Sequence, residues 1–176
     1  GCEAKYARDF VYTENLDLTL DAVASSGLAL NYSIVAGNNA TLNNAILSFN
    51  DSGQLTVEIT QQGNNIYNQA VPVRVVFVVG QGDTTLSNFT IPTKTNLDND
   101  FNLTPPTSNR SGNLTYSSSN LNVATLSGTL ISIIGVGNTT ITATQLANSR
   151  YKSASITAVF RVLVASFRID PGLNWD

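Results

Sequence analysis

The stretch "TQQGNNIYNQA", residues 60–70, returns at residues 144–154 as "TQLANSRYKSA", with Thr, Gln, Asn, Tyr and Ala in the same places. The same offset of 84 residues places Tyr32 on Tyr116, and no gap interrupts the match between these points. A catalytic site is rarely copied whole within one small protein, whereas a stacked structural module often is. The repeat therefore predicts two similar modules of about 80 residues each.

Each repeat shows a hydrophobic period of two. In "LALNYSI", residues 28–34, the large apolar side chains alternate with Ala, Asn and Ser, as in a half-buried strand. The segments "QLTVEIT", "VRVVFVV" and "ITAVFRVLV" alternate in the same way. Such runs, broken every 8 to 12 residues by Gly, Asn, Asp or Pro, predict an antiparallel β-sandwich. No helical period of useful length is present.

A break between the repeats lies at "GQGDTT", residues 80–85. The predicted organisation is an N-terminal segment (1–9), module 1 (10–79), a linker (80–87), module 2 (88–164), and the start of a further module or a tail (165–176).

Both repeats resemble a known kind of module. The segments "YSIVAGNNATLNNAILSFNDSGQLTVEITQQGNNIYNQA" and "FTIPTKTNLDNDFNLTPPTSNRSGNLTYSSSNLNVATLSGTLISIIGVGNTTITATQLANSRYKSA" are similar to bacterial-type immunoglobulin-like modules, which occur in tandem in bacterial surface adhesins and in phage or giant-virus structural proteins. The resemblance implies an all-β fold of two tandem immunoglobulin-like antiparallel β-sandwiches. It also implies an extracellular place on a virion or cell surface, where such modules serve as spacers, decorations or adhesive stalks.

The composition argues against several functions. The chain has no His and a single Cys, Cys2, so Ser-His-Asp and Cys-His catalysis and His-based metal sites are excluded. The net charge is -3 and the basic residues are scattered, so nucleic acid is not an expected partner. No apolar run approaches the ~20 residues of a membrane span. Gly1-Cys2 resembles the end of a lipoprotein signal, although a processed or arbitrary start is preferred because that Gly would have been removed.

Acidic residues offer no catalytic or metal site by pattern. Asp98 and Asp100 lie close together in "NLDND", but a calcium loop needs more ligands and a Gly turn, so a solvated turn is expected. Glu58 lies alone on an outward strand face, without an acid/base partner. We expect no catalytic residue, no cofactor and no metal, and hence no enzyme.

The repeated loop joins the last two strands of each sandwich, at the end where the chain enters the module. We expect Tyr67 and Tyr151 each to lay a ring over the exposed end of its own core, as a lid, in preference to stacking on a ligand. Tyr151 should then face residues 80–87.

The final strands leave apolar side chains on the outward face, where they invite association. The residues are Val76, Val78, Val159 and Leu163. We expect either the same chain, through a loop or the N-terminal segment, or an adjacent subunit to cover them.

Taken together, these patterns predict a non-enzymatic structural or surface protein. Its expected partners are neighbouring subunits or modules of a surface assembly, with a host-surface glycan or protein as a further option. The alternative is a carbohydrate-binding module of a secreted protein, to which only Tyr116, Tyr151 and Trp175 would contribute aromatic rings. Eight Asn-x-Ser/Thr sequons would accept glycans in a eukaryotic secretory setting.

Overall fold

The computed structural model describes residues 6–166, and these residues form two compact units. Unit 1 contains residues 6–83 together with 147–152, and unit 2 contains residues 84–146 and 153–166. The segment Ala147–Lys152 thus belongs to unit 1, although the residues on both sides of it belong to unit 2. As a result, the polypeptide passes from one unit to the other three times.

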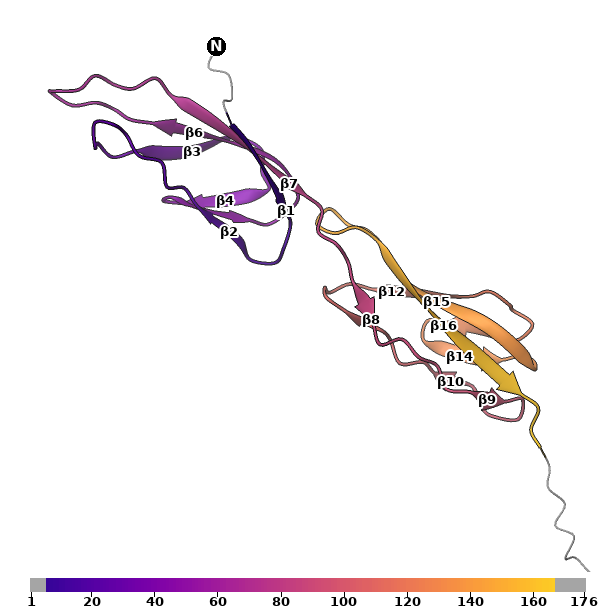
Figure 1. Cartoon of the computed structure of the whole chain (residues 1–176). Coiled ribbons are helices and arrows are strands. Elements are labelled where there is room, and N and C mark those ends of the chain that lie inside the picture. Colours follow the sequence, from indigo (N-terminus) through magenta and orange to yellow (C-terminus); the bar gives the residue numbers. More distant parts are fainter. Residues whose placement is uncertain (1–5, 167–176) are drawn as a thin grey trace, which may run out of the picture. The chain divides into compact units, whose positions relative to one another are not determined.

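Unit 1 is a two-layered sandwich of seven strands (Figure 1). They are β1 (Tyr6–Val11), β2 (Leu16–Thr19), β3 (Asn31–Ala36), β4 (Ala40–Asn43), β5 (Ile46–Phe49), β6 (Gly53–Thr60) and β7 (Val73–Gly80). One sheet has the order β1-β7-β6-β3 and the other has the order β2-β5-β4. This division of strands between two sheets is that of an immunoglobulin fold.

The first strand departs from the sequence expectation in two ways. Residues 6–9, assigned above to an N-terminal segment, belong to β1, and β1 pairs with β7 in parallel, from Tyr6 opposite Val75 to Val11 opposite Gly80. The pairing extends the sheet sideways and does not cover its outward face. Its physical basis is that β7 has a second edge, whose N–H and C=O groups need partners that β6 cannot supply.

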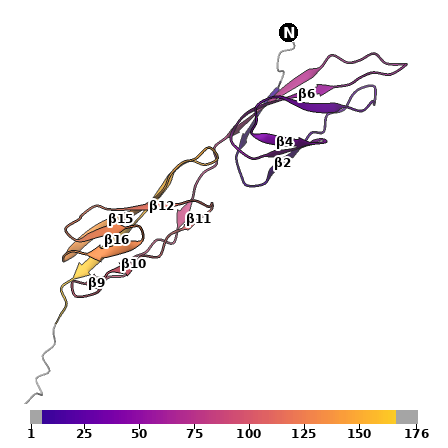
Figure 2. The same cartoon turned by 180° about the vertical axis from the view of Figure 1, so that it is seen from behind.

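Unit 2 repeats the plan with shorter first strands (Figure 2). Its strands are β8 (Leu86–Ser87), β9 (Lys94–Thr95), β10 (Phe101–Asn102), β11 (Thr107–Ser108), β12 (Leu114–Ser118), β13 (Ala124–Ser127), β14 (Leu130–Ile133), β15 (Gly137–Gln145) and β16 (Ala154–Leu163). The sheets are β12-β15-β16-β9 and β10-β14-β13, and β8 pairs with β11. As in unit 1, the first strand of the larger sheet pairs in parallel with the last, here β9 with β16.

Each unit has its own hydrophobic core, built by the alternation seen in the sequence. On β6, Leu55 and Val57 are fully buried, and on β15 Ile141 and Ala143 are fully buried. The all-β, immunoglobulin-like sandwich predicted from the sequence is therefore confirmed. Among residues 6–166, no helix is long and apolar enough to cross a membrane.

Candidate functional site: two copies of one loop

The loop between β6 and β7 is built around the side chain of Asn64. Its Oδ1 accepts the N–H groups of Ile66 at 2.9 Å and Tyr67 at 2.8 Å, and the Asn64 N–H donates to the Tyr67 carbonyl at 2.8 Å. Three hydrogen bonds within four residues hold the turn and present Tyr67 at its end.

The loop between β15 and β16 makes the same three bonds. Asn148 Oδ1 accepts the N–H groups of Arg150 at 2.9 Å and Tyr151 at 2.8 Å, and the Asn148 N–H donates to the Tyr151 carbonyl at 3.0 Å. Because the two turns agree while their surroundings differ, the turn is a property of the local sequence. This explains why Asn and Tyr recur three residues apart in both repeats.

A glutamine lies at the start of each loop, and its hydrogen bonds differ between the two units. In unit 2, Gln145 is fully buried, accepts from Ser108 Oγ at 2.6 Å, and donates to the carbonyls of Ser111 and Gly112 at 3.3 Å. In unit 1, Gln61 Oε1 accepts the Ala70 N–H at 3.1 Å across the loop. The recurrence of Gln in both copies is the signal that could have marked this position, although Gln61 bonds across its own loop and Gln145 bonds to the segment between β11 and β12.

Tyr151 is part of the hydrophobic core of unit 1. Its residue surface is only 7% exposed, and its ring meets that of Tyr12 edge to face, with the centroids 5.5 Å apart. The backbone pairs in parallel with Gly82: the Gly82 N–H donates to the Arg150 carbonyl at 2.8 Å, and the Lys152 N–H donates to the Gly82 carbonyl at 2.9 Å. Tyr151 therefore lies beside residues 80–87, but it covers the core of unit 1 instead of its own module's core.

Side chains of the same segment add further contacts within unit 1. The Arg150 guanidinium lies 5.9 Å from the centroid of the Tyr12 ring, and Lys152 Nζ lies 2.8 Å from an Asp83 carboxylate oxygen. Both partners of the Lys152–Asp83 pair are mostly exposed, so the pair contributes little to stability. The buried ring and the backbone pairing are the main contributions.

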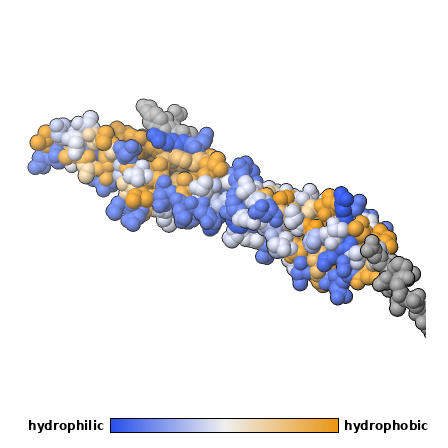
Figure 3. Space-filling view, turned by 60° about the horizontal axis from the view of Figure 1, so that its bottom comes forward, coloured by the Kyte–Doolittle hydropathy of each residue, from blue (hydrophilic) through white to orange (hydrophobic). Residues whose placement is uncertain are grey.

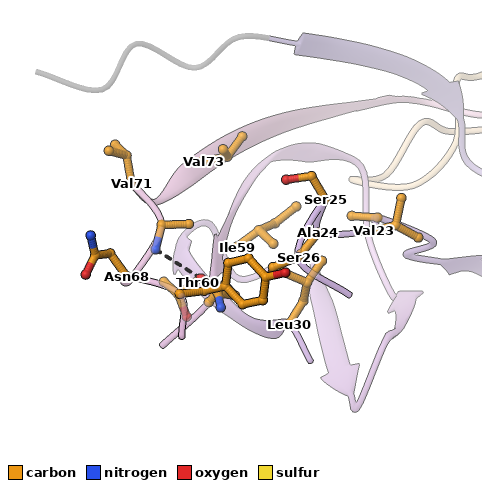
Figure 4. Close-up of a pocket in the computed structure, with 14 residues that line it drawn as sticks. Val23, Ala24, Ser25, Ser26, Leu30, Ile59, Thr60, Asn68, Val71 and Val73 are labelled. Atoms are coloured by element: carbon orange, nitrogen blue, oxygen red, sulfur yellow. Dashed lines mark hydrogen bonds between the residues drawn. The ribbon is translucent and has the colours of Figure 1, made fainter. Parts of the chain in front are cut away.

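Tyr67 has no such cover. It is 49% exposed and lines a groove of about 370 Å³ between the β2–β3 loop and the start of β7. Figure 4 shows Val23 and Ala24 on one side of this groove and Val71 and Val73 on the other. Two copies of one turn therefore hold one buried tyrosine and one half-exposed tyrosine.

The surroundings of Tyr67 are apolar and exposed. Val23, Ile66 and Val71 each expose three quarters or more of their surface. Figure 3 shows hydrophobic and hydrophilic surface side by side at the end of unit 1 that carries the β6–β7 loop. We call this part of unit 1, with Val23, Ile66, Tyr67 and Val71, the loop end.

The outward apolar residues of the last strands differ in exposure. Val76 is half-buried, because β7 lies between β1 and β6, while Val78 is exposed. On β16, Val159 and Leu163 are both about half exposed.

Glu58 on β6 is not alone on its face. One of its carboxylate oxygens lies 2.8 Å from Nε of Arg74 on β7, opposite it in register. Period-two patterns do not reveal which strands are neighbours, so this pairing was missed. An ion pair on a strand face is not an acid/base pair.

The two clustered aspartates accept hydrogen bonds from the protein itself. Asp98 accepts the Thr95 N–H at 2.7 Å, and Asp100 accepts Ser132 Oγ at 2.8 Å and the Ile133 N–H at 3.0 Å. Because these bonds favour the charged carboxylates, they hold the pKa of both groups below the usual value. The arrangement is that of hydrogen-bonded turns, and no cluster of three potential metal ligands occurs among residues 6–166.

Of the three aromatic residues considered for carbohydrate binding, two pack inside the units. Tyr116 contacts Phe89 with ring centroids 6.3 Å apart, and burial raises the pKa of its hydroxyl. Tyr151 lies in the unit 1 core, and Trp175, like Cys2, lies outside the described residues. Asn39 is the one sequon asparagine that is buried, whereas the other seven are exposed.

Comparisons with known proteins identify no family for the chain. No family model matches the chain, and no curated protein sequence matches it. Among solved structures, Drosophila N-cadherin EC1-4 is similar at 13% identity and a TM-score of 0.36, covering 89% of this chain and 47% of that one. Mouse cadherin-23 EC22-24 is similar at 14% identity and a TM-score of 0.34, covering 91% and 64%. A SusE-like surface-located polysaccharide-binding protein of Bacteroides thetaiotaomicron is similar at 12% identity and a TM-score of 0.31, covering 89% and 33%. The chain thus spans less than two thirds of the length of each of these three proteins.

Proposed function

We propose that the chain is a non-enzymatic structural protein of a virion or cell surface, in which tandem immunoglobulin-like modules act as a spacer, a decoration or an adhesive stalk. The observation that carries the proposal is that Ala147–Lys152 is part of unit 1, although it lies between two strands of unit 2 in the sequence. The buried Tyr151 ring and the backbone pairing with Gly82 make this segment a structural part of that unit.

A spacer must keep a distal element away from its anchor, and connectivity of this kind serves that purpose. Domains joined by a single linker move independently by default. In this chain the polypeptide passes between the two units three times, and one of these passages carries an aromatic ring buried in unit 1. No chemistry at the loop is needed for this role.

The outward residues Val76, Val78, Val159 and Leu163 are the proposed contacts with neighbouring subunits or modules of the assembly. Of the four, Val159 and Leu163 on β16 are the most exposed. Exposed apolar side chains on a sheet face support such a contact, because covering them removes apolar surface from water.

For the carbohydrate-binding alternative, one tyrosine is exposed among the side chains that the structure describes: Tyr67, which was not one of the three rings considered from the sequence. A glycan array that shows binding by the whole chain, lost on Tyr67→Ala, would favour this alternative over the spacer.

The spacer proposal is tested by ¹⁵N relaxation of the whole chain. We expect amides of β1–β7 and amides of β12–β16 to report one common rotational correlation time, which separates into two in Tyr151→Ala. Two different correlation times in the wild-type chain would refute the proposal, because independent units cannot hold a fixed spacing.

A further inference from the structure

The two loops differ in whether the ring of their tyrosine is covered by other residues. Both carry the same hydrogen-bonded turn, but the ring of Tyr151 is buried against unit 1 while that of Tyr67 is 49% exposed. The turn at Asn64 is therefore formed without a partner, and its tyrosine is held in a defined place before anything binds it. A pre-organised aromatic residue loses little conformational entropy on binding.

The surface that receives Tyr151 shows what such a loop packs against. In unit 1 it consists of residues at the end where β7 finishes: Tyr12 after β1, Ser52 in the β5–β6 turn, and Gly82 after β7. We call this the exit end of unit 1. It is an end of an immunoglobulin-like unit, not a sheet face.

Unit 2 has an exit end of the same construction. In unit 1 the Tyr12 N–H donates to the Gly80 carbonyl at 2.9 Å, and in unit 2 the Asn96 N–H donates to the Leu163 carbonyl at 3.0 Å. Val136, in the β14–β15 turn, takes the place of Ser52 at the offset of 84 residues. Five apolar side chains at this end are each at least half exposed. They lie after β9, between β12 and β13, between β14 and β15, and after β16: Leu97, Leu121, Ile134, Val136 and Val164.

The chemistry of each loop fits one of these ends. The loop that packs on unit 1 carries Arg150, above the Tyr12 ring, and Lys152, beside Asp83. In the other loop the same positions hold Ile66 and Asn68, and residues 61–72 contain no charged side chain. A loop without charged side chains, with Ile66 in the place of Arg150, suits an end where apolar side chains are exposed and Asn96 stands in the place of Tyr12.

From these observations we infer that the loop end of unit 1 binds the exit end of unit 2 of a second copy of this chain, with Tyr67 as the central contact. The two surfaces are different, so the contact is heterologous: two copies joined by one such contact keep one loop end and one exit end with which further copies can bind. The inference deepens the proposed structural function and rests on it, since it adds an end-to-end contact between spacers.

Sedimentation equilibrium of the whole chain tests the inference. Between about 10 μM and about 1 mM, where small interfaces become populated, the weight-average mass should rise to roughly twice the monomer value or more, without a plateau at the dimer. Tyr67→Ser should remain monomeric, and so should the double variant Leu97→Asp, Val136→Asp. All these side chains are exposed, so an unchanged melting temperature verifies that the variants are folded.

Mixing the two variants provides the sharpest test. Each retains one intact surface, so an equimolar mixture should form 1:1 dimers and nothing larger. Leu130→Asp is the matched control, because Leu130 is an exposed apolar residue on β14 away from both ends, and it should associate as the wild type does.

Three results would overturn the inference: a wild-type chain that stays monomeric to the highest concentration, a Tyr67→Ser chain that associates normally, or a mixture without dimers. A monomeric chain that binds a glycan through Tyr67 would overturn it in favour of carbohydrate binding. None of these results affects the relaxation test, which concerns Tyr151.

Discussion

Replacing Tyr151 with Ala should destabilise unit 1, although residue 151 lies between two strands of unit 2. The ring is almost fully buried in the core cluster of unit 1 and meets Tyr12 edge to face at 5.5 Å. Truncation would leave a cavity beside Tyr12 in this core cluster.

The magnitude follows from the burial. Removing a buried aromatic side chain costs about 3–5 kcal/mol in a closed core, of which an edge-to-face ring pair supplies about 0.5–1.5 kcal/mol. Tyr151 comes from a loop that can relax, so we take the lower limit, about 3 kcal/mol. For a unit of this size the melting temperature falls roughly 4–8 °C per kcal/mol, which gives a decrease of roughly 12–24 °C.

The assay is hydrogen exchange read separately on amides of β5–β7 and of β14–β16, combined with calorimetry. Tyr67→Ala is the matched control: it has the same residue, turn and substitution, but half its surface is exposed, so it should cost less than about 1 kcal/mol. The reasoning fails if Tyr151→Ala lowers protection in unit 2 alone, or if the two variants cost the same.

Four further predictions concern packing, polarity, pH and the outward face. A Cβ at Gly82 would overlap the Tyr12 carbonyl oxygen and lie 3.0 Å from the Tyr151 ring, so Gly82→Ala should cost about 1–3 kcal/mol by urea unfolding, while Gly80→Ala, with no contact closer than 3.7 Å, should cost little. Asn39 is 4% exposed, its side-chain atoms have no hydrogen-bond partner among residues 6–166, and the matching residue in unit 2 is Val123. Asn39→Val should therefore raise the free energy of unfolding by about 1–2 kcal/mol, and a lower melting temperature would contradict this. The pKa of Asp100 is lowered by the hydrogen bonds from Ser132 and Ile133. Its contribution to the stability of unit 2 is therefore complete above the unfolded pKa of about 3.9 and is lost as the pH falls through the folded value. Asp100→Asn should reduce the acid dependence of unit 2 unfolding, and an NMR titration of Asp100 at its ordinary pKa would refute this cause. The pair Val159→Asp and Leu163→Asp should leave the melting temperature within a few degrees of wild type and block incorporation into the surface assembly, whereas normal incorporation would exclude these side chains as contacts.

Much of the fold could be read from the sequence because it depends on local periodicity. Alternation of period two identified β6, β7 and β16, and the 84-residue repeat identified two units of one kind. The Asn–Tyr turn is equally local: its hydrogen bonds join residues two or three apart, and they are the same at Asn64 and Asn148.

Long-range partners could not be read in this way. The sequence did not reveal that β1 pairs in parallel with β7, or that Glu58 meets Arg74, because a strand pattern defines a buried face and not a neighbouring strand. The side chain of Gln145 likewise accepts a hydrogen bond from Ser108, which lies 37 residues away in the sequence.

The two tyrosines show the difference between what the local sequence determines and what the tertiary structure determines. The sequence by itself determined the turn that presents Tyr67 and Tyr151, since each turn is closed by the asparagine three residues before. Only the tertiary structure decided that Tyr151 enters the core of unit 1 while Tyr67 remains half exposed. The reason is physical: a hydrogen-bonded turn is formed by adjacent residues, whereas burial of an aromatic ring depends on the residues that the rest of the chain brings against it.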